Sequence, residues 1–72
     1  MKPTTLKQAR ERRGLTQPEL ADAAGLDQAT VSRLETGRVV NPSYETVKRL
    51  ARVLQIDPQR LRFGLPSQAV SL

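Results

Sequence analysis

The chain has 72 residues, a length that accommodates one small domain. It contains neither Cys nor His, which excludes disulfides, zinc-finger sites, a cysteine nucleophile and a Ser-His-Asp triad. No apolar run approaches the ~18 residues of a membrane span, and the N-terminus leads into no signal-peptide core. We therefore expect a soluble, cytoplasmic protein that is not an enzyme and that holds neither a metal ion nor a cofactor.

Basic residues outnumber acidic ones by 12 to 7, giving a net charge of +5. Most of the basic residues are Arg, whose forked guanidinium suits phosphate and guanine. This balance favours an anionic partner. Tyr44 and Phe63 are the only aromatic residues, too few to stack the bases of a single strand. Duplex nucleic acid remains the open possibility.

Glycines and capping residues divide the chain into segments of helix length. Thr5 and Thr16 each begin a capping-box pattern, and Asp27, Ser43 and Asp57 are N-cap candidates. Together with the apolar spacing, they predict five helices: roughly Thr5 to Arg13, Gln17 to Ala24, Gln28 to Thr36, a fourth that follows Ser43 and carries Val47, Leu50, Ala51 and Leu54, and a short last one from Pro58 to Phe63. No segment alternates with the period of a strand. The expected fold class is an all-α, compact five-helix bundle.

The connection between the second and third predicted helices is short. It consists of Gly25, Leu26 and Asp27, a glycine-containing turn typical of a helix-turn-helix, with Leu26 expected to close the core at the corner. Residues 65–72 show neither caps nor an apolar stripe. We therefore predict a domain over residues 1–64 and a flexible C-terminal tail over residues 65–72.

Residues 15–38 read LTQPELADAAGLDQATVSRLETGR, and the pattern continues through Asn41-Pro42-Ser43 to Ile56-Asp57-Pro58. In this ordered set and its spacings the chain resembles the Xre/Cro-type helix-turn-helix family, the small DNA-binding domains of phage repressors and many bacterial regulators. The resemblance covers roughly Leu6 to Leu61. It implies a lambda-repressor-like fold, with the helix-turn-helix formed by the second and third helices, and double-stranded DNA as the partner.

The third predicted helix has an outward face that suits a DNA groove. If Val31 and Leu34 point inward, the residues left facing outward are small or hydrogen-bonding. Arg33 can fork onto the O6 and N7 of guanine, and Gln28 can pair with adenine. Ala29 suits a thymine methyl group, and Ser32 can reach a base or a phosphate. In the family, the positions matching Gln28, Ala29, Ser32 and Arg33 face the bases; a plain solvated face is the alternative interpretation.

Phosphate contacts are expected on both sides of this helix. The resemblance assigns a phosphate to Gln17, and free N–H groups at a helix N-terminus give that role a physical reason. The alternative for Gln17 is an ordinary first-turn residue. Arg38 resembles the family's phosphate-binding position in the following loop, and the remaining predicted phosphate contacts are Thr30, Thr36 and Asn41.

Arg10 and Glu35 form a predicted structural ion pair. Arg10 follows Leu6 by four residues on the apolar stripe of its helix, so its guanidinium needs a partner. Glu35 lies toward the inner edge of the third helix. The family commonly places an Arg–Glu pair at these two positions, bracing the first helix against the third, and we place the pair outside the binding site.

The leading functional hypothesis is a sequence-specific DNA-binding transcriptional regulator, acting as a repressor. A domain of this size covers one half-site, so we expect a homodimer on a palindrome with half-site centres ~34 Å apart. Leu61, Phe63 and Leu65 are either the dimer patch or the closure of the core. The alternative function is the antitoxin of a toxin–antitoxin pair, which binds DNA and a toxin partner.

Overall fold

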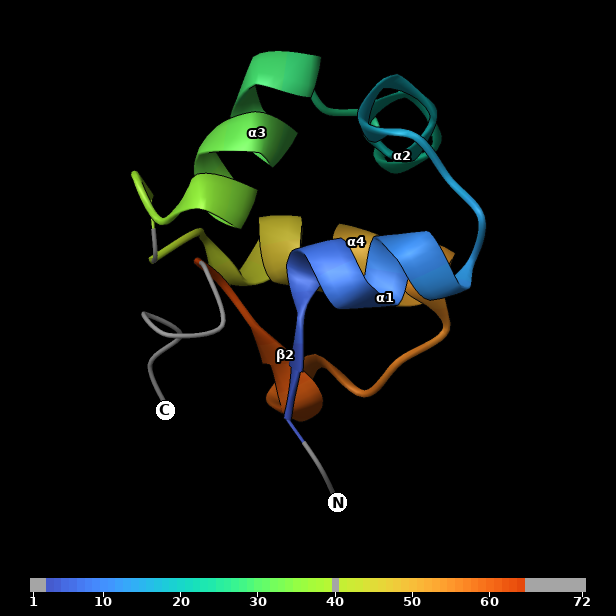
Figure 1. Cartoon of the computed structure of the whole chain (residues 1–72). Coiled ribbons are helices and arrows are strands. Elements are labelled where there is room, and N and C mark those ends of the chain that lie inside the picture. Colours follow the sequence, from blue (N-terminus) through green and yellow to red (C-terminus); the bar gives the residue numbers. More distant parts are fainter. Residues whose placement is uncertain (1–2, 40, 65–72) are drawn as a thin grey trace.

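Four α-helices contain most of the described residues in the computed structural model, which describes residues 3–39 and 41–64. The elements in chain order are β1 (Thr4–Thr5), α1 (Leu6–Arg12), α2 (Gln17–Ala24), α3 (Gln28–Thr36), α4 (Tyr44–Leu54), the 3-10 turn η1 (Pro58–Arg60) and β2 (Leu61–Arg62). In Figure 1, α2 and α3 lie above α1 and α4, and the strands lie below them. Within the described ranges no helix is long and apolar enough to span a membrane.

The first two helices begin at the capping boxes that the sequence predicts. Thr5 Oγ1 accepts a hydrogen bond from the Gln8 amide at 3.2 Å, and Gln8 Oε1 accepts one from the Thr5 amide at 3.1 Å. Thr16 and Glu19 exchange the same two bonds at 3.2 and 2.9 Å. These bonds satisfy amides that a helix start leaves unpaired, which is why the chain turns helical at these points.

The turn between α2 and α3 confirms the predicted helix-turn-helix. Gly25 ends α2 in the left-handed conformation at φ 69°, which glycine adopts without steric cost. The Leu26 amide then donates to Ala21 O at 2.8 Å, and the half-buried Leu26 side chain packs on the core. This tight corner sets the position of α3 relative to α2.

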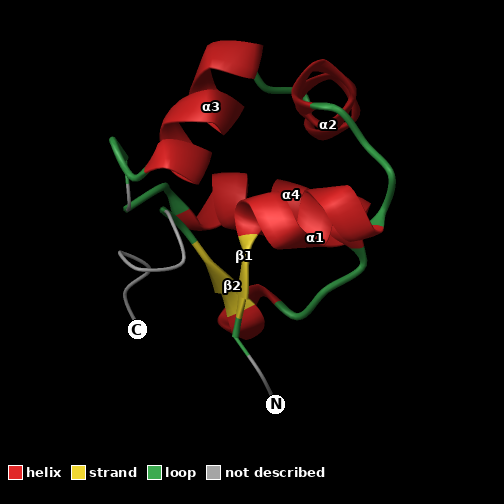
Figure 2. Ribbon diagram, in the orientation of Figure 1, coloured by secondary structure: helices red, strands yellow, loops and turns green. Residues whose placement is uncertain are grey.

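The prediction of a fifth helix is wrong. Its first three residues form only η1, and the chain then extends into β2, which pairs parallel with β1 in the register Thr4 to Leu61 and Thr5 to Arg62 (Figure 2). Leu61 and Phe63 are buried on either side of the half-buried Arg62, an alternation typical of a strand. The all-α class therefore holds for the bulk of the fold, with four α-helices and one short strand pair.

The core lies between the helices and is closed from below by the β2 segment. Its most deeply buried side chains are Leu6, Leu20, Val31, Leu34, Leu50 and Leu61. Leu61 is 1% exposed and Phe63 is 5% exposed, so both belong to the core and cannot form a dimer patch. Leu65, the third residue of that predicted patch, and the predicted tail at residues 65–72 lie outside the described residues.

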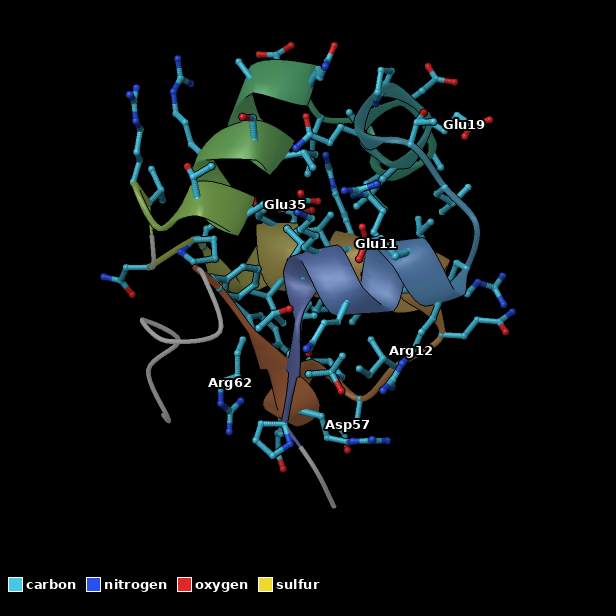
Figure 3. All side chains as sticks on the ribbon, in the orientation of Figure 1. Glu11, Arg12, Glu19, Glu35, Asp57 and Arg62 are labelled. Atoms are coloured by element: carbon cyan, nitrogen blue, oxygen red, sulfur yellow. The ribbon has the colours of Figure 1, made fainter. Side chains whose placement is uncertain are left out.

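An ion pair in the interior joins α1 to α3. Arg10 Nε lies 2.6 Å from Glu35 Oε2 and Arg10 Nη2 lies 3.1 Å from Glu35 Oε1, the bidentate geometry in which arginine binds a carboxylate most strongly. Glu35 is 4% exposed. Arg10 Nη1 also donates to Leu15 O at 2.8 Å, so one guanidinium connects α1, the loop before α2, and α3. Figure 3 shows Glu35 on the side of α3 that faces α1.

Removing one member of this pair should be more costly than removing both. Arg10→Ala leaves the Glu35 carboxylate buried without its counter-charge, and should lower the free energy of unfolding by about 3–5 kcal/mol. The double variant Arg10→Met/Glu35→Leu, which leaves no buried charge, should recover most of that loss. Urea denaturation followed by far-UV circular dichroism measures both values.

The matched control for this experiment is Arg49→Ala. Arg49 pairs with Glu45 at 3.5 Å on the exposed side of α4, where an ion pair contributes less than about 1 kcal/mol. If Arg10→Ala destabilised the protein no more than Arg49→Ala does, the interior pair would not hold α3 in place.

Candidate nucleic-acid interface

The outward face of α3 carries the four predicted base-contacting residues. Gln28, Ala29 and Arg33 are exposed and Ser32 is half-buried, whereas Val31 and Leu34 on the opposite face are buried. The only acidic residue within α3 is Glu35, and its carboxylate points into the interior. The outward face thus offers hydrogen-bonding and small side chains without a carboxylate that would repel phosphate.

An open depression joins this face to the loop that follows it. Its lining residues are Ala29, Ser32, Arg33, Thr36 and Arg38. Gly37 ends α3 at φ 84°, and the Arg38 amide donates to Arg33 O at 3.0 Å, which turns the chain back over the last turn of the helix. The structure therefore brings Arg38, a predicted phosphate contact, beside three of the four predicted base contacts.

The other predicted phosphate contacts near α3 differ in their surroundings. Thr36 Oγ1 donates to Ser32 O at 3.0 Å, so in this arrangement its hydrogen is committed to the helix backbone. Thr30 is half-buried on the first turn. Asn41 is exposed in the loop before α4 and lies outside the depression. Asn41 thus has an accessible side chain, whereas Thr36 must first release its intrahelical bond to donate to a phosphate.

Gln17 lies at the start of α2 and is tied to the interior ion pair. Its Nε2 donates to Glu35 Oε1 at 3.0 Å, so the Glu35 carboxylate receives hydrogen bonds from both Arg10 and Gln17. The hydrogen bond with Glu35 raises the pKa of Arg10 above its ordinary value, although burial opposes this shift. A side-chain amide nitrogen carries two hydrogens, and the second hydrogen on Gln17 Nε2 remains able to donate to another acceptor.

The first turn of α2 has fewer free amides than a typical helix start. Pro18 has no N–H, and the Glu19 amide donates to Thr16 Oγ1. The backbone hydrogen bond from Thr16 lowers the pKa of Glu19 below its ordinary value. Because few amides remain, backbone donation is a weaker argument for a phosphate here than the sequence suggests, and the Gln17 side chain becomes the main candidate donor.

The bond between Gln17 and Glu35 is the feature of the site that the sequence did not reveal. These residues are 18 positions apart and lie on different helices, so no helical periodicity relates them. A polar residue in the first turn of a helix is also common without any tertiary role. The contact becomes visible only once α2 and α3 are placed.

Comparison with known proteins identifies the family. The family described as a helix-turn-helix domain matches residues 4–63. In Bacillus subtilis, the uncharacterized HTH-type transcriptional regulator RghRB is 38% identical over 56 residues, which are 78% of this chain and 40% of that protein. The HTH-type transcriptional repressor RghR of the same organism is 38% identical over 58 residues, which are 81% of this chain and 43% of that protein. The chain thus spans about two fifths of the length of these relatives.

A solved structure shares the fold. The restriction-modification controller protein C.AhdI from Aeromonas hydrophila superposes with a TM-score of 0.71 at 36% sequence identity, covering 76% of this chain and 82% of that one. The family match includes all six α-helical and strand elements and the turn between α2 and α3. The chain belongs to the helix-turn-helix family of the Xre type.

Proposed function

We propose that the chain is a sequence-specific, double-stranded-DNA-binding transcriptional regulator that represses by placing α3 in the major groove. The observation that carries this proposal is the outward face of α3, where Arg33 lies among residues of the helix that present no carboxylate, on a surface that continues into Arg38. A basic surface of this kind attracts the duplex, and its base-reading side chains supply specificity. We propose the cytoplasm as its location, because a DNA-binding regulator must share a compartment with the DNA.

The size of α3 fits the groove. An α-helix with its side chains is about 10–12 Å in diameter, and the major groove is about 12 Å wide. In this arrangement Gln28, Ala29, Ser32 and Arg33 face base edges. Gln17 and Arg38 flank them from the start of α2 and from the loop after α3, with Thr30, Thr36 and Asn41 as further phosphate contacts. Contacts on both flanks would fix how deep α3 enters and which bases it meets.

The dimensions of the protein favour two copies on a palindromic site. Its largest principal extent is 26 Å, so two copies fit side by side on half-sites whose centres are about 34 Å apart. One copy covers one half-site, and linking two binding events raises affinity without any new contact. We therefore propose a homodimer on DNA, formed by a surface other than Leu61 and Phe63.

The names of the relatives agree with this function. RghR is named a transcriptional repressor and C.AhdI a controller protein. An antitoxin needs a further segment that binds its toxin, and residues 65–72, which follow the predicted domain, lie outside the described residues. No observation on residues 3–39 and 41–64 favours that alternative, nor does any of these names. The division into a domain at residues 1–64 and a tail stays a prediction.

Binding-site selection from a randomised duplex pool tests the proposal. With the purified chain near physiological salt, the expected outcome is an enriched inverted repeat whose half-sites lie about one helical turn apart. A pool that binds without converging would indicate backbone-only association and would contradict a sequence-specific regulator.

Arg33→Ala should remove sequence preference rather than general affinity. Loss of a forked contact with guanine should weaken binding to the selected site by about 1–3 kcal/mol and leave random duplex nearly unaffected. Arg52→Ala is the matched control because it removes the same charge from an exposed position on α4. Competition binding on both duplexes measures the difference. Equal losses on the two duplexes would overturn the assignment of Arg33 to base readout.

Gln17→Ala should weaken binding to every sequence alike. A hydrogen bond to a charged phosphate contributes about 1.5 kcal/mol or more, and it carries no base information. Gln59→Ala removes the same kind of side-chain amide from an exposed position on η1 and should have no effect. Since Gln17 also donates to Glu35, the unfolding midpoint is measured beside the affinity. If affinity fell on the selected site alone, Gln17 would be reading a base.

A further inference from the structure

Asp27, the N-cap residue of α3, differs from every other N-cap residue in the described part of the chain. The side chains of Thr5, Thr16, Ser43 and Asp57 each accept a hydrogen bond from an amide in the first turn of their own helix. Asp27 occupies the same position at α3, with extended backbone angles of −78° and 147°, yet its carboxylate accepts no such bond. The capping role that the sequence predicts for this side chain is therefore absent.

The carboxylate of Asp27 also has no cation partner among residues 3–39 and 41–64. Arg10 pairs instead with Glu35, and Arg49 pairs with Glu45. Asp27 is exposed and directly precedes Gln28, the first residue of the proposed base-reading face. The Asp27 carboxylate can therefore still accept hydrogen bonds. It lies at the N-terminal end of α3, where the proposed base-reading face begins.

A carboxylate in the major groove is selective by its chemistry. It can only accept hydrogen bonds, and the donors on base edges there are the N4 amino group of cytosine and the N6 amino group of adenine. Thymine presents O4, and guanine presents N7 and O6, all of which are acceptors. A carboxylate facing these atoms loses its water without gaining a partner, which penalises the wrong base.

We infer that Asp27 is a specificity-determining residue, which accepts a hydrogen bond from the amino group of cytosine or adenine and rejects thymine and guanine at one position of each half-site. This inference rests on the proposed function, because it requires α3 to enter the groove. It assigns the residue before Gln28 to base discrimination instead of helix capping. A carboxylate close to the phosphates is electrostatically unfavourable, and pairing it with an amino group offsets that cost.

Binding-site selection with Asp27→Asn tests the assignment. Asn is as good an N-cap as Asp, so folding is preserved, and its amide can both donate and accept. The wild-type chain should prefer cytosine over thymine, or adenine over guanine, at least about fivefold at one half-site position. In Asp27→Asn that preference should fall to about twofold or less, with the other positions unchanged. Thermal unfolding of the variant confirms that it remains folded.

Asp57→Asn is the matched control, since it makes the same charge change at another N-cap, one whose carboxylate accepts from the Gln59 amide at 2.9 Å. It should leave every base preference as in the wild type. If Asp27→Asn selected the same site with the same preferences as Asp57→Asn, the inference would be overturned while the proposed function stood. If the wild-type chain selected no site, the proposed function itself would fail, and the inference with it.

Discussion

The orientation of α3 depends on one buried carboxylate. Glu35 receives hydrogen bonds from Arg10 on α1 and from Gln17 on α2, and Arg10 in turn holds the carbonyl of Leu15 in the loop between those helices. Apolar packing is tolerant of small rotations because it has no direction. Hydrogen bonds at 2.6–3.1 Å are directional, and they define which side of α3 faces outward.

This arrangement matters because a helix reads DNA by its angular position. Successive residues are 100° apart, so a rotation of α3 by a fraction of that angle would change which side chains point directly outward. The inner side of α3 carries Val31, Leu34 and Glu35, and its outer side carries Arg33. Apolar burial determines roughly which face of α3 points outward, and the hydrogen bonds to Glu35 fix the rotation of α3 about its axis more closely. The same network reaches Gln17, so the proposed phosphate contact and the proposed base contacts share one rigid support.

Much of the fold could be predicted from the sequence because local signals mark its helix ends. The capping boxes at Thr5 and Thr16 and the glycine turn at Gly25 act over a few residues, and α1, α2 and α3 begin and end within one residue of the expected positions. The last segment was mispredicted since its pairing partner is distant. Leu61 pairs with Thr4, and a strand of two residues has no periodicity of its own.

The candidate site likewise contains features that the sequence predicts and features that depend on tertiary packing. The outward residues of α3 followed from helical spacing, and the Arg10–Glu35 pair followed from an arginine on an apolar stripe and the family resemblance. The Gln17–Glu35 bond depends on how α2 and α3 pack, which spacing cannot show. Asp27 illustrates the converse: its sequence position predicts a cap, and only the orientation of the side chain in space shows that the cap is not made.

On this arrangement, duplex DNA binds to the face formed by the start of α2, by α3 and by the loop after it. Backbone amide chemical shifts, recorded by NMR while a selected duplex is titrated into the labelled chain, would locate the DNA-binding face residue by residue. We expect the largest changes at Gln17, at residues 27–33 and at Arg38, with little change at residues 58–62 of η1 and β2. Changes centred on η1, β2 or the exposed side of α4 would contradict it.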